Sequence, residues 1–465
     1  MEIRLRFRFI KLEFHNGQSM KSEIQITNGS LFKNIFLFSI PLVFTNLLQI
    51  LFNMADSSVV GRFAGALALG AVGSDGQLCF LCSGLLIGIG GGVNVLVAFY
   101  IGQNNKKELN DMVHTAAVFC LISGFAIMII GWISAPLVLK AMKTRPELLK
   151  DALLYFRIYL ISMPAMALYN FGNAVLSAHG NTKLPLIFLA LAGIANVFLD
   201  LLLVIVFKMS VAGVAIATVV AQYISCILTV KATFKDTGNV QFNRKVLKLN
   251  IHKTMQLVKI GIPAGLQNVV FAVANLFIQA GVNSFDALMV AGNAATMNGD
   301  NLVYNIMAAF YTAGATFIGQ NYGARNKTRI LKSYFISTGY ASIIGIILGI
   351  VLYAFGPQFL GLFTTDSTVV DYAMQKFRIM TFSFGISAFM DGTIAANRGL
   401  GKTFIPSIFV FLGSCFFRVL WIYTIFAHYR TIESLFLLYP VSWFVTAIFE
   451  IIYFAIIYRK ETKNL

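Results

Sequence analysis

Charged residues are scarce in this chain of 465 residues. Only 12% of them are Asp, Glu, Lys or Arg, whereas 58% are hydrophobic. Negatively charged residues are rarer than positively charged ones, with 19 Asp and Glu against 36 Lys and Arg, so the formal net charge is +17. A mean hydropathy of +0.76 excludes an ordinary soluble protein, in which about a quarter of the residues are charged. This composition predicts an all-α polytopic membrane protein.

Patterns that hold metals, nucleotides or disulfides are also missing. The stretch GLLIGIGGG at 84–92 lacks the spacing of a nucleotide-binding loop and predicts close helix packing through Gly84, Gly88 and Gly92. No Walker A pattern occurs, which excludes this type of ATP-binding site and ATP as an energy source. The five histidines do not have the spacing of metal ligands. We expect no metal, no cofactor and no disulfide, because all five cysteines lie in apolar segments, at Cys79, Cys82, Cys120, Cys226 and Cys415.

Long apolar segments are what the chain has in abundance. A helix needs about 20 residues to cross the hydrocarbon core of a bilayer. Large soluble domains do not fit between the segments of that length. Twelve such segments occur, at 34–60, 71–101, 112–138, 152–178, 183–207, 211–230, 255–281, 290–318, 331–356, 372–397, 402–426 and 433–458.

The positive charges lie mostly on one side of these segments. If both termini are cytoplasmic, 24 Lys and Arg fall in cytoplasmic segments, 7 in outer segments and 5 within spans, with Lys183, Lys332 and Lys402 at the span edges counted as cytoplasmic. That asymmetry is the positive-inside pattern of membrane proteins. It favours a lipid bilayer over nucleic acid as the partner of the positive charge, and it predicts a multi-pass membrane protein with both termini in the cytoplasm.

The same features divide the chain into five parts. We expect a cytoplasmic tail at 1–33, a first lobe at 34–230, a second lobe at 255–458 and a short C-terminal tail at 459–465. The basic stretch 231–254 between the lobes predicts a cytoplasmic linker facing anionic lipid. Residues 1–19 are basic and do not form the apolar core of a signal peptide, so they are either a tail or precede a translation start at Met20.

An internal repeat relates the two lobes. IPLVFTN at 40–46 aligns with IPAGLQN at 262–268, YIGQNN at 100–105 with FIGQNY at 317–322, and SAHGNTKLP at 177–185 with RGLGKTFIP at 398–406. The offset stays between 217 and 222 residues, and the six spans between the copies give both copies the same orientation. A parallel duplication of six helices is a transporter architecture, with the substrate bound between the lobes. Because both lobes belong to one chain, we expect a monomer to contain a complete pathway for the substrate.

Polar residues form stripes inside the expected first lobe. They recur every three or four residues, which places them on one helical face in each span. Since lipid-facing polar groups are costly, the stripes predict a polar interior. The stripes are Thr45, Gln49, Asn53 and Asp56 in the first span, Tyr169, Asn173 and Ser177 in the fourth, Asn196 and Asp200 in the fifth, and Thr218, Gln222 and Ser225 in the sixth.

Two of these residues are acids at membrane depth. Asp56 ends a 26-residue stretch without another ionisable side chain, and Asp200 is followed by LLLVIVF. Burial disfavours a charged carboxylate, so such a pair can take up and release a proton near neutral pH. Alternatively, amide and hydroxyl neighbours complete an oxygen shell for sodium. Binding of either a proton or sodium can shift the lobe between two conformations. Pro41 removes a backbone hydrogen bond from the first helix and is a candidate position for a bend.

The second lobe has polar positions of its own. Asn298, Asn301 and Asn305 form a stripe in the eighth span, beside Asp300. Asp300 and Arg418 lie at similar depth by residue count, which predicts an ion pair between them. Asp391 and Glu450 lie nearer the cytoplasmic side, where we expect them to line the inner mouth.

From about residue 30 to 458, the chain resembles the multidrug and toxic compound extrusion (MATE) family. The stretches that carry the resemblance are NMADSSVVGRF, YIGQNN, VLSAHGNTKLP, NVFLDLLLVIVF, GVAIATVVAQ, FIGQNYGARN and NRGLGKTFIP. The resemblance implies two six-helix lobes around a central cavity. It also implies an antiporter that expels amphipathic, often cationic, drug-like compounds in exchange for protons or sodium.

The resemblance assigns roles to particular positions. The ion-coupling positions fall on Asp56, Asn196, Asp200 and Thr218, and the helix-bending proline falls on Pro41. Cavity amides fall on Gln49 and Asn173, to which the stripes add Asn53, Tyr169, Asn301 and Asn305 as cavity residues. One branch of the family carries an acid in the seventh helix, but this chain has none there, so coupling is expected in the first lobe alone. We favour protons over sodium.

Two other functions remain open at this stage. A lipid-linked oligosaccharide flippase would more often have additional helices and a cationic cavity. A membrane-embedded enzyme would need a nucleophile and base, or a metal set, at membrane depth, and the sequence contains none. We therefore predict a transporter and not an enzyme.

Overall fold

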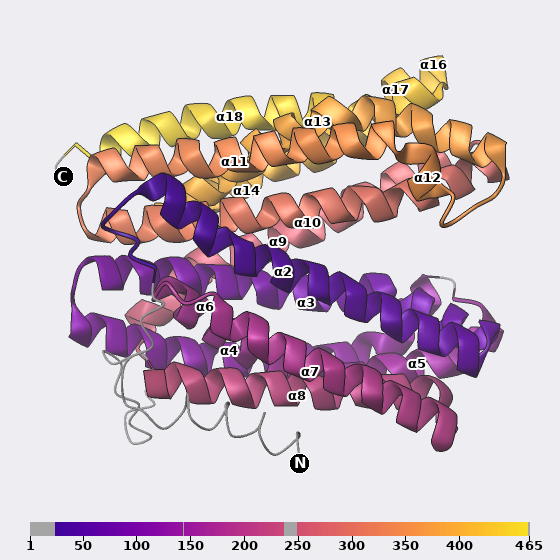
Figure 1. Ribbon diagram of the computed structural model, residues 1–465, viewed down its shortest axis with the longest axis horizontal. Helices are drawn as coiled ribbons and strands as arrows, with labels where there is room; N and C mark the ends of the chain where they lie inside the picture. The colour runs from indigo at the N-terminus through magenta and orange to yellow at the C-terminus, as the bar shows by residue number, and fades with distance from the viewer. Residues whose placement is uncertain (1–23, 143, 237–248, 464–465) are drawn as a thin grey trace, which may run out of the picture.

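The computed structural model describes residues 24–142, 144–236 and 249–463, and every regular element in these ranges is a helix (Figure 1). Half of the basic linker, residues 237–248, and residues 1–19 lie outside the described residues. The first lobe contains α2 (Leu31–Val59), α3 (Ala66–Gly102), α4 (Lys106–Ala141), α5 (Pro146–Leu160), α6 (Met163–Ala178), α7 (Lys183–Leu201) and α8 (Ser210–Asp236). Short π-helical turns extend α2 through Val60–Ala64 and α7 through Leu202–Val206.

The second lobe repeats this order with more interruptions. Its long helices are α9 (Ile251–Val282), α10 (Ala287–Gly323), α11 (Lys327–Ala354), α13 (Ser367–Gly399) and α18 (Leu438–Glu461). One span, Phe404–Tyr429, consists of α14 (Phe404–Val410), α15 (Phe417–Trp421) and α16 (Ala427–Tyr429), joined by π-helical turns at Phe411–Phe416 and Ile422–Phe426. The short helices are α12 (Gly356–Leu360) and α17 (Ile432–Phe436).

Within residues 24–142, 144–236 and 249–463, twelve helical stretches long and apolar enough to cross a membrane agree with the predicted spans, with one correction. Eleven are single helical stretches of sufficient length and hydropathy, and α5 and α6 together form the twelfth. The sequence predicted one helix over 152–178, but α5 and α6 meet at an angle of 43°. Pro164 lies in the first turn of α6, where its missing N–H and fixed backbone favour a helix start, and Ile161 and Ser162 form the break.

The two lobes form two stacked groups of helices in Figure 1, with the first lobe in indigo to magenta and the second in pink to yellow. Helix α2 runs obliquely between them. Its first half contacts the second lobe, where Phe38 packs edge-on against Phe317 at a ring distance of 5.4 Å. Its second half contacts α7, where Phe52 lies against Gly193. The first helix of the chain therefore joins both lobes.

The duplication is visible in the backbone at an offset of 221 residues. Helices α3 and α10 are both 37 residues long. Asn105 caps α4 and Asn326 caps α11, each by accepting a backbone N–H at 3.2 Å. Gly180 and Gly401 follow equivalent helices with φ of +87° and +75°, a conformation that favours glycine. The alignment of YIGQNN with FIGQNY is corrected by one helical turn, because the end of α3 corresponds to the end of α10.

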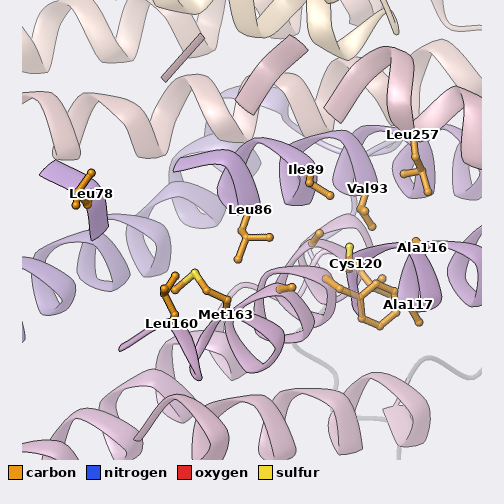
Figure 2. Close-up of a cluster of buried hydrophobic side chains, with 14 of the residues drawn as sticks. Leu78, Leu86, Ile89, Val93, Ala116, Ala117, Cys120, Leu160, Met163 and Leu257 are labelled. Atoms are coloured by element: carbon orange, nitrogen blue, oxygen red, sulfur yellow. The ribbon is translucent and has the colours of Figure 1, made fainter. Parts of the chain in front are cut away.

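Glycines allow the two lobes to touch backbone to backbone. A Cβ atom at Gly88 would overlap the backbone of Gly265 on α9, and one at Gly92 would lie 2.8 Å from the Gly261 Cα. The predicted packing role of Gly84, Gly88 and Gly92 is confirmed, since all three face α9. The opposite face of α3 packs in the core of its own lobe, which Figure 2 shows from Leu78 and Leu86 to Cys120 and Met163.

All hydrogen bonds between the lobes lie in one half of the molecule, among the residues that the structure describes. Toward the middle, Asn268 donates to the Gly84 carbonyl at 2.9 Å and Asn46 donates to the Asn305 carbonyl at 2.8 Å. Toward the turns at 103–105 and 324–326, Lys253 pairs with Glu108. We call this half the closed end. The lobes are not hydrogen-bonded to each other in the other half, which we call the open end.

The N-terminal segment reinforces the closed end. The Ile24 N–H donates to the Gly180 carbonyl of the first lobe at 3.2 Å. Two residues later, the Ile26 carbonyl accepts from Arg329 of the second lobe at 3.0 Å. The segment thus binds both lobes across the same end of the molecule.

We predict that Gly88→Ala destabilises the protein by about 1–3 kcal/mol, because the new methyl group would force α3 and α9 apart. Gly73→Ala is the matched control, since it lies on the same helix and no atom lies within 4 Å of its added Cβ. The measurement is the melting temperature of both variants in the same detergent. Equal melting temperatures would contradict the glycine contact.

Candidate functional site

The structure brings the four predicted ion-coupling residues together inside the first lobe. Asp56 comes from α2, Asn196 and Asp200 from α7, and Thr218 from α8. The Thr218 hydroxyl donates to Asp56 Oδ2 at 3.4 Å and to the Val214 carbonyl at 3.0 Å. Asp200 is fully buried and Asn196 is 5% exposed, so this group is shielded from solvent on the α7 side.

The two acids lie close together, on helices α2 and α7 that pack against each other. Within the described ranges, neither oxygen of Asp200 has a hydrogen-bond partner, and Asp56 Oδ1 also has none. Lysine and arginine form no ion pair with either acid there. Two ionised carboxylates so close together would repel each other, so the arrangement favours a proton or another cation between them.

Unsatisfied polar atoms define what this site can hold. The Asn196 amide nitrogen is also buried without a partner. Buried polar atoms are nearly always hydrogen-bonded in proteins, so four unpaired atoms in one place point to a function that uses them. The carboxyl oxygens, the amide oxygen and the Thr218 hydroxyl are the ligand types that suit a proton or a hard cation. We call Asp56, Asn196, Asp200 and Thr218 the acid site.

A second feature is a central cavity of about 330 Å³ between the lobes, within the usual range for small-molecule sites. Helices α2, α3 and α6 form its first-lobe wall, and α9, α10 and α13 form the second. Four predicted cavity residues line it: Gln49, Tyr169, Asn173 and Asn305.

Two predicted cavity residues lie outside its lining. Asn53 and Asn301 are exposed and lie one helical turn beyond Gln49 and Asn305, toward the open end. The polar stripes predicted the correct helix faces. Each face, however, extends further along its helix than the part of the molecule in which the two lobes enclose the cavity. Pro41 lies inside the continuous helix α2, and the next turn is tied back by a hydrogen bond from the Thr45 hydroxyl to the Pro41 carbonyl at 2.9 Å.

Both signs of charge line the second-lobe wall of the cavity. Asp391 and Arg398 lie on α13, seven residues apart, and therefore project from the same helix face about 10 Å apart along the axis. Arg398 Nη2 donates to Gln267 Oε1 at 3.0 Å, while its buried Nε has no partner. The expectation that Asp391 lines the inner mouth is corrected, since it lines the central cavity.

Arg398 was missed as a cavity residue, although RGLGKTFIP had identified its segment. It lies at the edge of the expected span 372–397, where a cation usually reaches the membrane surface. The observed helix continues to Gly399 and carries Arg398 inward. Tyr304 and Tyr311 of α10 were also missed, and their ring centroids lie 6.4 Å apart on the same second-lobe wall.

The predicted ion pair between Asp300 and Arg418 is wrong. Asp300 Oδ2 pairs with Lys376 Nζ at 2.9 Å, and Lys376 also donates to Asn293 Oδ1 at 3.0 Å. Arg418 instead donates to Ser442 Oγ at 3.1 Å and stacks over the Tyr439 ring. Residue count estimates only the depth of a residue along its helix, whereas its neighbours around a bundle depend on how the helices pack.

Glu450 also lies away from the inner mouth. It is fully buried on α18, where its Oε2 accepts a hydrogen bond from Asn397 at 2.9 Å. It does not line the central cavity. The acids of the second lobe are therefore partly satisfied, in contrast to those of the acid site.

Comparison with known proteins agrees with this geometry. The family model described as MatE matches residues 41–202 and 263–424. The probable multidrug resistance protein YpnP of Bacillus subtilis (strain 168) is 26% identical over 396 residues, covering 83% of this chain and 87% of that protein. The FAD transporter of Shewanella oneidensis is 25% identical over 346 residues, covering 72% and 75%.

Solved structures share the fold. One is described as the outward-facing conformation of a multidrug resistance MATE family transporter of the MOP superfamily. It superposes with a TM-score of 0.88 at 21% identity, covering 96% of this chain and 100% of that one. The two matched segments of the family model begin at Pro41 and Pro263, which are aligned positions of the internal repeat.

We predict that Lys376→Met destabilises the second lobe by about 3–5 kcal/mol, because it leaves the Asp300 carboxylate without its buried partner. Adding Asp300→Asn should recover most of the lost stability, since the uncompensated charge is then gone. Thermal unfolding of the single and double variants measures both effects. If the double variant is no more stable than Lys376→Met, the contribution of Lys376 to stability does not come from its ion pair with Asp300.

Proposed function

Because this chain belongs to the MatE family of membrane transporters, we propose that it is a secondary active multidrug exporter that exchanges amphipathic organic compounds for cations. The observation that carries the proposal is the acid site: a buried carboxyl pair, without a basic partner, inside a lobe that also walls the central cavity. Ion binding there and substrate binding in the cavity act on the same first-lobe helices, α2 among them.

The coupling follows from the burial of the acid site. With a cation bound, Asp56 and Asp200 lose their mutual repulsion and α2 can pack against α7 and α8. Without one, two like charges in a low-dielectric surround force the helices apart or admit water. Since Gln49 and Asp56 lie seven residues apart on α2, movement of this helix changes the cavity wall.

We propose the proton as the coupling ion, with sodium as the alternative. A proton on one of the two neighbouring carboxyl groups removes their repulsion without any further ligand. Sodium would need further oxygen ligands, which Asn196 and Thr218 can offer in part. The acid site lies toward the open end of α2, so the ion would enter from that side.

The closed end is proposed to face the cytoplasm of a bacterial inner membrane. Most positive residues lie on that side, and both termini belong to it under the positive-inside pattern. The relatives that match over most of their length are bacterial proteins. Since the cavity lies between the lobes of one chain, we propose that the monomer is the transporting unit.

The cavity suits substrates that are aromatic and polar at once. Tyr304, Tyr311 and Phe271 offer ring surfaces, and Gln49 and Asn173 offer amides. A specific observation favours a second candidate, export of an acidic aromatic compound such as a dinucleotide: the Arg398 guanidinium lies in the cavity wall without a carboxylate partner among the described residues. A relative carries the name FAD transporter.

We expect Asp56→Asn and Asp200→Asn each to abolish efflux of a fluorescent lipophilic cation, because an amide cannot take up and release the coupling ion. The measurement is efflux from pump-deficient bacteria at equal expression, with the proton gradient and then the sodium gradient collapsed. Asp371→Asn is the control, an exposed acid of the second lobe. If wild-type efflux stops when only one of the two gradients is collapsed, the ion of that gradient is the coupling ion. Full efflux in both variants would overturn the carboxyl mechanism.

We expect Arg398→Gln to reduce export of a fluorescent aromatic carboxylate more than export of a lipophilic cation, since the guanidinium attracts the first and repels the second. The exposed Arg378 on the same helix provides the control variant Arg378→Gln. The measurement is the ratio of the two efflux rates in matched cells. An unchanged ratio would remove Arg398 from substrate selection and the second candidate with it.

A further inference from the structure

A buried acid of the second lobe lies against the side-chain amide of a neighbouring helix. Glu450 on α18 and Asn397 on α13 are both fully buried, and the two helices pack against each other. Asn397 Nδ2 donates to Glu450 Oε2 at 2.9 Å and to the Glu450 carbonyl oxygen at 3.4 Å. One end of the amide group is therefore bound to one oxygen of the carboxyl group.

The other polar atoms of these two groups are unsatisfied. Glu450 Oε1 and Asn397 Oδ1 are each buried without a hydrogen-bond partner among residues 24–142, 144–236 and 249–463. An amide oxygen accepts hydrogen bonds and does not donate them, and the same holds for an ionised carboxylate. The two oxygens therefore cannot satisfy each other while Glu450 is charged. Since buried polar atoms are nearly always paired, a charged Glu450 leaves this contact incomplete.

A single proton on Glu450 Oε1 would complete the contact. The carboxyl group then has a donor beside its acceptor, and the amide group has an acceptor beside its donor. Two parallel hydrogen bonds close a ring, in which Oε1–H donates to Asn397 Oδ1 and Nδ2–H donates to Glu450 Oε2. Both unpaired oxygens are satisfied, and no charge is buried, so the large cost of holding a lone carboxylate away from water disappears.

The arginines on helices packed against α18 form their hydrogen bonds elsewhere. None of the ion pairs within the described ranges includes Glu450. Arg398 follows Asn397 on α13 but donates to Gln267 of α9 at 3.0 Å. Arg418 of α15 donates to Ser442 Oγ at 3.1 Å, eight residues before Glu450. A charged partner therefore does not explain how Glu450 is buried.

The remaining titratable groups around Glu450 also have other contacts. Asp391, six residues before Asn397, accepts from Ser387 Oγ at 3.2 Å. The Tyr334 hydroxyl of α11 shares a hydrogen bond of 2.9 Å with Thr393. Helix α14 carries no titratable side chain. The others on α18 or on elements packed against it are Tyr453, next to Phe409, Cys415 in the turn Phe411–Phe416, Glu433 on α17, and Asp371, Lys376 and Arg378 in the first half of α13.

We propose that Glu450 and Asn397 form a proton-binding site of the second lobe, in which Glu450 keeps its proton and joins α18 to α13 through an acid–amide ring. A hard metal cation takes about six oxygen ligands, more than these two groups provide. The proposal goes beyond the coupling proposed for the acid site and does not depend on it. The coupling proton must bind and leave in each cycle, whereas the proton of Glu450 stays with the lobe.

Infrared spectroscopy of the purified full-length protein in lipid tests the protonation state directly. We expect the difference spectrum between the wild type and Glu450→Gln at about pH 7 to show the loss of a protonated carboxyl band. Glu433→Gln is the control, because Glu433 is an exposed acid of the same lobe and should contribute carboxylate bands. Loss of carboxylate bands in Glu450→Gln would overturn the proposal, including the case of a carboxylate bridged to the amide by water.

A second variant tests the ring itself. Asn397→Leu keeps the acid but removes both hydrogen bonds of the amide, so we expect the protonated carboxyl band of Glu450 to shift. An unshifted band would show that the amide oxygen is not the partner of the carboxyl proton.

The pH dependence of stability tests the same site by another measurement. Glu450→Gln keeps both hydrogen bonds, because the new amide donates where the acid O–H did, but it has no proton to lose. In the unfolded wild type the glutamate releases its proton above about pH 4, whereas the folded protein retains it, so wild-type stability falls as the pH rises. We expect the melting temperature of Glu450→Gln relative to the wild type to increase from about pH 5 to about pH 8, and Glu433→Gln to show no such trend. A flat or decreasing difference for Glu450→Gln would contradict the retained proton.

Transport in proteoliposomes with an imposed pH gradient separates a retained proton from a coupling proton. We expect Glu450→Gln to retain pH-driven export. If this variant melts like the wild type but loses export, Glu450 exchanges its proton during transport, and the proposed retention is wrong. If Asp56→Asn and Asp200→Asn retain export, the coupling at the acid site fails, while the infrared and melting results still decide the state of Glu450. If Glu450→Gln does not fold, the band shift in Asn397→Leu decides.

Discussion

At Gly88 and Gly92, helix α3 has no side chain, and the backbone of α9 therefore lies directly against it. The lobes meet there without interdigitating side chains, and the same device returns where Gly102 and Gly323 approach the backbones of α10 and α3. Small residues are the usual means of close helix contact in membranes, where no hydrophobic force draws helices together. These contacts hold the closed end shut, and the cavity is the space that remains where α2 and α10 diverge from them.

Duplication copied this scaffold but not its acids. The first lobe buries Asp56, Asp75 and Asp200 with few partners, whereas the second lobe matches Asp300 with Lys376 and Glu450 with Asn397. Paired groups hold one state over a wide pH range, because removing either charge leaves the other uncompensated. Unpaired carboxyl groups change their protonation when the surround changes. The proposed ion coupling is therefore assigned to the first lobe, whose buried acids form no ion pair among the described residues.

The cavity joins these two halves. Its first-lobe wall carries amides and Tyr169, next to helices that also hold the acid site, while its second-lobe wall carries Asp391 and Arg398. Under the proposed mechanism, a substrate bound between the walls would contact the lobe whose helices respond to ion binding. A transporter needs such a connection in order to convert ion binding into a change of access.

The sequence by itself determined the membrane class, the twelve spans, the duplication and the faces on which Asp56, Asn196, Asp200 and Thr218 lie, because all of these follow from hydropathy and helical periodicity along one chain. It predicted the wrong partners for Asp300 and Arg418, and it gave no sign of the break between α5 and α6 or of Arg398 in the cavity. Only the tertiary structure decided these. The physical reason is that periodicity describes one helix at a time, whereas partners, cavity depth and burial depend on the angles and contacts at which helices distant in the chain pack together.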